Sequence, residues 1–179
     1  KTLNNAGFDV RGARDFFTTL KKANQFSGGA APAFLQTHPI TSNRISDIED
    51  RLKDYPYKQR LGSHTFHYVK GKLKALLGDK SNTKNILEEN IKNKIYINEA
   101  GERFALAYIY LMDNEFIKSQ EQIQWLFDNE QSNPMLSQLY INYLIKTNKV
   151  TEAKKLYVQN LNFFPSNRSF IFGLADLYL

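Results

Sequence analysis

The sequence predicts an all-α protein whose second part is a solenoid of helical repeats. Apolar residues recur along the chain at helical spacing, and the apolar-polar alternation typical of strands does not occur beyond residue 56. Residues of similar type also recur 34 positions apart, at Ala107, Ile141 and Ala175 and again at Ser119 and Ala153. These two observations together favour stacked helical pairs over an ordinary helical bundle.

The chain begins with a predicted amphipathic helix. Asp9 is placed to cap it, and the helix extends to about Ala23. One apolar face is expected from five residues: Val10, Ala13, Phe16, Phe17 and Leu20. The Gly-rich residues 27–32 then predict a break and a mobile loop.

A second helix follows and leads to a domain boundary. Thr41 or Ser42 can cap this helix, whose apolar stripe consists of Ile45, Ile48 and Leu52. Residues 55–57 (Tyr-Pro-Tyr) end the helix because proline cannot continue it. The boundary therefore divides the chain into domains 1–56 and 57–179.

The second domain is predicted to be built of helical pairs. The first pair covers residues 64–78 and 82–94, and its two helices are expected to face each other through Phe66, Leu73, Leu76 and Leu77 on one side and Ile86, Leu87 and Ile91 on the other. Two further pairs are expected at 100–133 and 134–167. Residues 168–179 are an apolar first helix without its second, so this end is expected to be exposed or covered by further sequence.

The spacing at which these residues recur is the period of the tetratricopeptide repeat, with unrepeated helical hairpins as the alternative. Small residues at the repeated positions let paired helices approach closely: Ala107, Ser119, Ala153 and Ala175. Large residues fill the matching pockets: Tyr110, Tyr178, Ile123 and Tyr157. Pro165 stands where the second helix of a repeat ends, whereas the preceding repeat has its Pro134 three residues late.

Composition excludes several classes of function. The chain has no cysteine, which excludes thiol catalysis, disulfide scaffolds and zinc ribbons. Its formal net charge is +6, from 24 Lys and Arg against 18 Asp and Glu, and this balance favours acidic partners or anionic surfaces. A lysine-rich solvated surface explains the charge as well, and we expect no nucleic-acid partner because no RNA- or DNA-binding motif is present.

No catalytic residue set is found in the sequence. His64 and His67 share a helix face at i, i+3, but no carboxylate or cysteine ligands accompany them. We therefore expect both histidines to lie on a polar surface. Glu88 and Glu89 lie in a run with Lys and Asn, which is typical of a solvated face. No phosphate-binding loop and no nucleophile elbow occurs.

Residues 5–9 (NAGFD) and 34–45 (FLQTHPITSNRI) resemble the end of the catalytic domain of BepA-type bacterial periplasmic zinc metallopeptidases. That family has an H-E-x-x-H peptidase domain followed by tetratricopeptide repeats. The resemblance implies that residues 1–56 are the C-terminal helices of the peptidase domain and 57–179 a truncated repeat domain. Because this sequence has no H-E-x-x-H, it implies a fragment that binds no cofactor and is inactive alone, with zinc in the full-length parent.

The same resemblance gives roles to two residues. It places His38 beside the active-site cleft as a zinc-gating residue or an extra zinc ligand, in a backbone that Pro39 stiffens. A hydrogen-bonded loop histidine is the alternative. Arg44 is expected to brace the loop near the active site, held by its own neighbour Asp47 or by a group elsewhere in the parent.

The resemblance also implies location and partners. It implies the bacterial periplasm or cell envelope, a zinc metalloendopeptidase as the parent, and helical repeats that bind protein or peptide substrates, outer-membrane assembly proteins among them. Two alternatives come from the residues themselves. One is a non-enzymatic tetratricopeptide adaptor that binds peptides or proteins, and the other is a basic RNA-binding helical protein, which would bind oligonucleotides in a salt-sensitive way.

Overall fold

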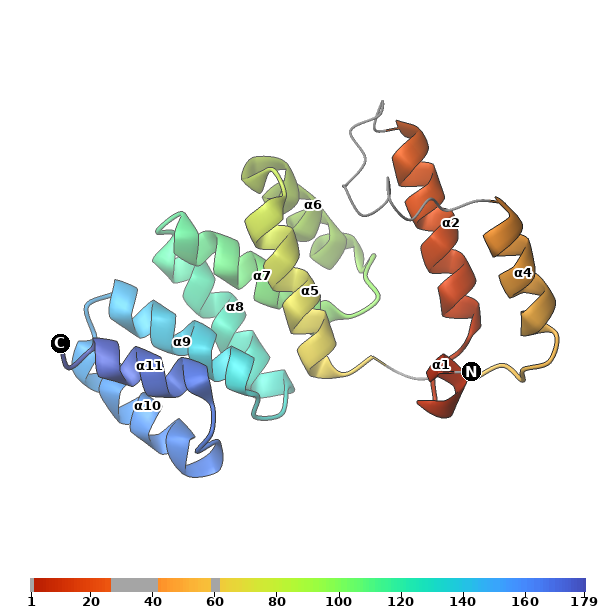
Figure 1. The fold of residues 1–179 in the computed structure, drawn as a ribbon. Coiled ribbons are helices and arrows are strands. Elements are labelled where there is room, and N and C mark those ends of the chain that lie inside the picture. Colours follow the sequence, from red (N-terminus) through yellow and green to blue (C-terminus); the bar gives the residue numbers. More distant parts are fainter. Residues whose placement is uncertain (1, 27–41, 59–61) are drawn as a thin grey trace. The chain divides into compact units, whose positions relative to one another are not determined.

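A computed structural model of the chain describes residues 2–26, 42–58 and 62–179. Within these ranges it contains ten α-helices and no strand (Figure 1). The all-α class predicted from the sequence is confirmed. The chain divides into two compact units, residues 1–61 and residues 62–179.

The first unit contains a short helix and two longer ones. They are α1 (Thr2–Asn5), α2 (Arg11–Phe26) and α4 (Ser42–Leu52). Helices α2 and α4 pack against each other. Both amphipathic helices predicted for this part are present, whereas the predicted break at 27–32 and the proposed cap Thr41 lie outside the described residues.

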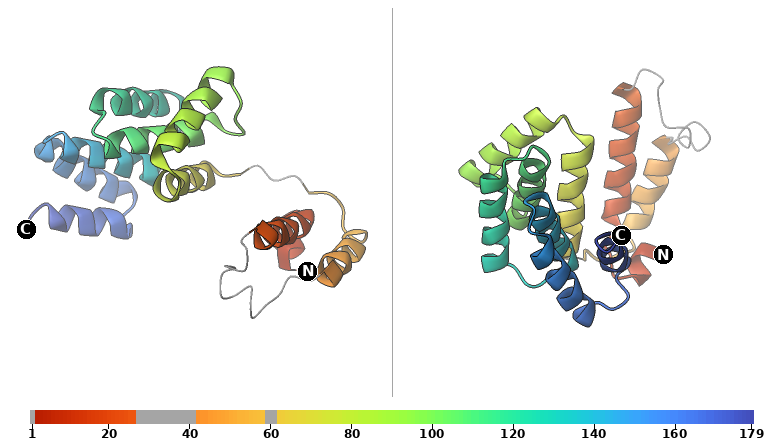
Figure 2. Two further views of the ribbon diagram at one scale, coloured as in Figure 1. Left: turned by 90° about the horizontal axis from the view of Figure 1, so that it is seen from above. Right: turned by 90° about the vertical axis from the view of Figure 1, so that its left-hand side faces the viewer.

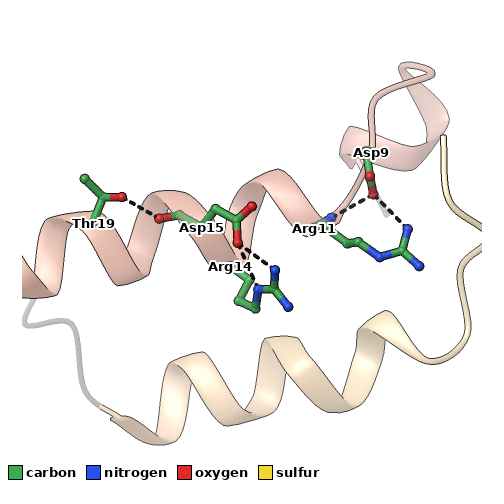
Figure 3. Close-up of polar contacts among 5 residues, drawn as sticks. All are labelled: Asp9, Arg11, Arg14, Asp15 and Thr19. Atoms are coloured by element: carbon green, nitrogen blue, oxygen red, sulfur yellow. Dashed lines mark hydrogen bonds and ion pairs between the residues drawn. The ribbon is translucent and has the colours of Figure 1, made fainter. Parts of the chain in front are cut away.

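Polar contacts fix the start of α2, as Figure 3 shows. The Asp9 carboxylate accepts a hydrogen bond from the backbone N–H of Arg11 at 3.0 Å, which is the capping role expected of it. Arg14 donates two hydrogen bonds to Asp15 at 2.9 and 2.8 Å. The predicted apolar face is only partly correct, because Phe16 lies exposed beside the half-buried Phe17.

The second unit consists of seven helices in the described chain, which follow one another as stacked antiparallel hairpins (Figures 1 and 2). Their bounds are α5 His64–Leu77, α6 Lys80–Asn93, α7 Glu99–Met112, α8 Phe116–Asn129, α9 Pro134–Lys146, α10 Val150–Phe163 and α11 Arg168–Asp176. The hairpins predicted at 100–133 and 134–167 are therefore present. This stacking is a solenoid-like arrangement.

The predicted repeat period is visible in the backbone. Helix α8 runs from 116 to 129 and α10 from 150 to 163, so both bounds recur at the spacing found in the sequence. The turns that precede these helices also match, because Asn114 and Asn148 both have left-handed backbones with φ of 61° and 62°. Asparagine tolerates this conformation better than most residues do.

Small residues allow close helix contacts, as predicted at three of four positions. Ala107, Ser119 and Ala153 are fully buried, and the Ser119 hydroxyl donates to the carbonyl oxygen of Ala107 at 2.9 Å. Ala175 and the large residue Tyr178 are exposed instead, in the helix whose surface was expected to be exposed or covered by further sequence. Helix α11 packs mainly on α10, so its other face is left uncovered in the described chain.

Helix α7 lies at the centre of the second unit. It contacts α5, α6, α8 and α9, and its sequence is apolar nearly all round, as expected of a buried helix. Phe104 stacks on Tyr68 of α5 with ring centroids 4.7 Å apart. On another face of α7, Ile109 packs with Leu87 of α6.

The predicted packing of the first hairpin is wrong. Helices α5 and α6 occur at the expected places, but the α5 residues predicted to face α6 are exposed: Phe66, Leu73, Leu76 and Leu77. Tyr68, Gly71 and Ala75 are buried instead, and they pack toward α7. Leu87 of α6 is also buried against α7, whereas Ile86 is exposed.

The physical reason is a close approach of two backbones. A Cβ atom on Gly71 would lie 2.5 Å from the carbonyl oxygen of Gly101, and a Cβ on Gly101 would lie 3.0 Å from the Cβ of His67. Helices α5 and α7 therefore cross where both lack side chains. Larger apolar residues do not fit into such a crossing, so they are placed on the outer face of α5.

Candidate functional site

Of the two residues singled out by the resemblance, the structure describes one. His38 lies outside the described residues. Arg44 lies in the first turn of α4 with an exposed side chain. Asp47, which was expected to hold it, forms an ion pair with Arg51 one turn further along the helix.

The two histidines of α5 have different neighbours. His64 Nδ1 lies 2.5 Å from the Glu130 carboxylate at the end of α8, and the His67 ring packs edge-on against Phe66. Nowhere in residues 2–26, 42–58 and 62–179 do three or more His, Asp or Glu side chains gather in a way that fits a metal ion. The described residues thus do not provide the zinc ligands that the resemblance implies for the parent.

The second unit contains a basic pocket of about 610 Å³ between α5 and the start of α7. We use the term basic pocket for this hollow, whose charged and titratable lining residues are His67, Lys70, Lys74, Lys94 and Glu102. Residues 95–98, which connect α6 to α7, form the opposite wall. Its volume lies within the range of ligand-binding clefts.

This wall is held in place by hydrogen bonds. Asn98 caps α7 by accepting from the backbone N–H of Gly101 at 2.7 Å. The Tyr96 hydroxyl donates to Glu99 at 2.6 Å, and this bond, together with the hydrogen bond and the charge of Arg103, holds the pKa of the Glu99 carboxyl below its usual value. Arg103 in turn lies over the Trp125 ring of α8. The connection is therefore anchored to two helices.

The basic pocket contains more positively than negatively charged side chains. Glu102 accepts from Lys74 at 2.8 Å, and its second oxygen accepts from Asn90 at 3.3 Å. The one carboxylate of the pocket lining is thereby engaged. Lys70 has no carboxylate partner among the described residues, and Lys94, which also lines the pocket, has an exposed side chain. The pocket consequently has a net positive charge.

An apolar stripe runs along the outer face of α5. It consists of Phe66, Val69, Leu73 and Leu77, all exposed, and these residues line a shallow hollow of about 390 Å³. Lys70 and Lys74 border this hollow as well as the basic pocket. The stripe and the basic pocket are therefore adjacent and form one continuous surface. Contiguous exposed apolar residues of this kind mark interaction sites.

A second hollow runs along the first helices of the hairpins. This polar groove, of about 220 Å³, is lined by residues of α5, α7, α9 and α11, including Lys72, Tyr108, Gln138 and Asn142. Gln138 donates to Asn142 at 2.9 Å and to Tyr157 at 3.0 Å. Its side-chain oxygen is buried and has no hydrogen-bond partner within the described part of the chain.

Neither hollow was predicted from the sequence. The lysines of α5 were interpreted as part of a general basic surface, and the signal that distinguishes them is local. Lys70 and Lys74 alternate with Val69 and Leu73, so charge and apolar surface lie side by side on one helix. Gln138 and Asn142, at i, i+4 on the first helix of a repeat, were a weaker signal for the polar groove.

Stacked hairpins with a groove along their first helices form a solenoid-like, all-α fold. No family model matches the chain. A curated protein of Vibrio cholerae serotype O1, which carries the name beta-barrel assembly-enhancing protease, is 31% identical over 74 residues. The matched part covers 41% of this chain and 15% of the relative's length.

This similarity supports a relationship to beta-barrel assembly-enhancing proteases, in the same direction as the resemblance of residues 5–9 and 34–45. The chain spans only a small part of that relative. Within the described residues, no helix combines the length and the apolar character that crossing a lipid bilayer requires.

Proposed function

We propose that this chain is the C-terminal part of a zinc-dependent metalloendopeptidase of the bacterial envelope, and that its tetratricopeptide-like repeats bind protein substrates or partners. The observation that carries the proposal is the 31% identity to the Vibrio relative, whose name describes a protease. The repeat period supports tetratricopeptide-like repeats, because α8 and α10 and their preceding turns follow it.

The repeat unit supplies binding surfaces in this proposal. Its polar groove offers the side chains of Gln138 and Asn142 to the backbone of a bound polypeptide. Because the relative's name refers to β-barrel assembly, we include outer-membrane assembly proteins among the proposed partners. The bacterial periplasm is then the compartment in which the protein acts.

Catalysis in the parent requires residues other than those described. The sequence has no H-E-x-x-H, and the described side chains do not fit zinc, so the metal and its ligands are proposed to lie upstream in the parent. The test is the gene sequence upstream of residue 1. The proposal requires an in-frame H-E-x-x-H there, and an upstream reading frame without it would refute the protease parent.

His38 and Arg44 have a proposed role next to that upstream site. His38 would gate the zinc or bind it as an additional ligand, since a neutral imidazole is a good zinc ligand. In the full-length parent, His38→Ala is expected to change proteolysis while the melting temperature stays the same. If instead His38→Ala lowers the melting temperature and leaves proteolysis unchanged, His38 is a structural loop histidine.

The second candidate function is a non-enzymatic adaptor. It is favoured by the fact that the basic pocket and the polar groove both lie in the repeat unit, which can bind partners without any catalytic domain. The upstream sequence separates the two candidates. A parent that has further helical repeats in place of a peptidase domain would be an adaptor.

A further inference from the structure

We propose that the outer face of α5 binds an acidic amphipathic helix of a partner polypeptide, with its apolar residues on the stripe and its carboxylates toward the basic pocket. This inference rests on the proposed function of the repeat unit as a binder of polypeptides. It adds a second binding surface to the polar groove and states the chemistry of the segment that occupies it.

The apolar stripe has the form of a helix-packing face. Phe66, Val69, Leu73 and Leu77 are separated by three or four residues, so they form one row along α5. Their exposure is large for apolar residues within a helix, at 49% for Leu73 and 81% for Leu77. The opposite face of α5 is already packed on α7. A helix laid along the row would bury it as the helices inside the unit bury one another.

The charges next to the stripe select acidic partners. Lys70 and Lys74 line both the hollow of the stripe and the basic pocket. Lys74 already pairs with Glu102, but Lys70 has no carboxylate partner in the described part of the chain. Elsewhere in the unit, Lys84 and Lys118 both form ion pairs with Glu115. Carboxylates on the bound helix would complement the unpaired charge.

The far wall of the basic pocket extends the apolar surface. Ile95 and Ile97 are exposed, the latter by 89%, although the connection that contains them is anchored through Tyr96 and Asn98. Two large apolar side chains are therefore exposed to solvent on a backbone that hydrogen bonds hold in place. A bound segment with apolar side chains on both sides of its carboxylates would contact the stripe and this wall at the same time.

The test uses three synthetic helical peptides that carry a fluorescein label. The probe has Leu at i, i+3 and i+7 with Glu beside them, the second has Lys in place of Glu, and the third has Ser in place of Leu. Fluorescence anisotropy with residues 1–179 at physiological salt measures binding. We expect the probe to bind about tenfold more tightly than either of the other two peptides, since both the apolar burial and the charge pairing contribute.

Variants locate the binding surface. Lys70→Glu and Leu73→Ser are each expected to weaken binding of the probe about tenfold, and Lys70→Ala to weaken it less. The matched controls lie on α10, where Lys155→Glu changes an exposed lysine and Val158→Ser changes a residue that is 48% exposed, nearly the same as Leu73. The controls are expected to bind as the wild type does. Circular dichroism checks that every variant is folded.

Several results would overturn the inference. These are no binding of the probe, equal binding of the Lys peptide, or unchanged affinity in Lys70→Glu and Leu73→Ser. Binding to phosphatidylglycerol vesicles without binding of the probe would make the face a membrane surface. Self-association that Leu73→Ser abolishes, again without peptide binding, would make it a contact between copies. If only Asn142→Ala abolishes binding of the probe, the peptide binds in the polar groove. That result would contradict this inference and leave the proposed function intact.

Discussion

Gly71 is the residue on which the packing of α5 against α7 depends. A Cβ there would meet the carbonyl oxygen of Gly101 at 2.5 Å, and a backbone atom in a packed helix cannot move aside easily. We expect Gly71→Ala to lower the free energy of unfolding by about 1–3 kcal/mol through this overpacking, although alanine favours helix by about 1 kcal/mol. Thermal and urea unfolding measure it.

The matched control is Gly12→Ala in α2. A Cβ on Gly12 would meet no atom within 4 Å, so only the helix preference of alanine acts there. The control is expected to leave stability unchanged or slightly increased. Equal effects of the two substitutions would contradict the close approach of α5 and α7.

Because of Tyr68, the free energy of unfolding is expected to depend on pH in the alkaline range. Burial, together with the charge of Glu130 and a hydrogen bond to it, raises the pKa of the Tyr68 phenol above its ordinary value of 10.0. The folded state therefore holds this proton more tightly than the unfolded state does. The resulting stability is complete below pH 10 and is lost as the pH rises above 10 toward the folded pKa.

The prediction is that Tyr68→Phe flattens the fall in melting temperature above pH 10 relative to the wild type. Tyr110, whose phenol donates to Glu88 at 2.6 Å and whose pKa is raised chiefly by burial, should act in the same direction. Tyr178→Phe at an exposed tyrosine serves as control. If Tyr68→Phe and Tyr178→Phe show the same slope, the buried phenol has no part in the pH dependence.

The turns between paired helices should respond alike in both repeats. Asn114 and Asn148 have the same left-handed backbone, and a β-branched residue is strained there. Asn114→Val and Asn148→Val are each expected to lower the free energy of unfolding by about 1–2 kcal/mol, whereas the glycine variants are tolerated. Chemical denaturation measures these values. A large difference between the two sites would mean that the turns are not equivalent.

In the first hairpin, apolar residues that look alike in the sequence differ in how far they are exposed, and substitutions at them should differ in effect. We expect Phe66→Ser to leave the melting temperature unchanged and to reduce binding of an apolar dye, because Phe66 is on the outer stripe of α5. Leu87→Ala, at a residue that is 1% exposed, should lower the free energy of unfolding by about 2–5 kcal/mol. A large loss of stability in Phe66→Ser would support the packing first predicted from the sequence.

The helices of the second unit were predictable and their packing was not. Apolar spacing and the recurrence at Ala107, Ile141 and Ala175 indicated α7 to α11 within a few residues, because periodicity depends on local sequence. Which face of α5 is buried depends on Gly71 and Gly101, thirty positions apart, and no local pattern links them. The candidate surfaces were missed for the same reason, since the basic pocket combines α5 with the connection that follows α6.

The chain as a whole is proposed to be the binding part of a larger protease. Its repeat unit offers two surfaces, the polar groove with Gln138 and the α5 face with Lys70, while the proposed chemistry belongs to residues upstream. In such a division the repeats select polypeptides and the metal site cleaves them. Removing the repeats from the parent should therefore alter the choice of substrate more than the cleavage of a short, unstructured peptide.

Proteolysis by the full-length parent tests this account most directly. The purified parent is incubated with casein, then with a zinc chelator, and then with zinc restored, beside residues 1–179 alone. The account predicts cleavage by the parent that the chelator abolishes and zinc restores, and no cleavage by residues 1–179, which have no H-E-x-x-H. A parent that binds polypeptides but does not cleave casein under any of these conditions, or cleavage by residues 1–179 alone, would contradict it.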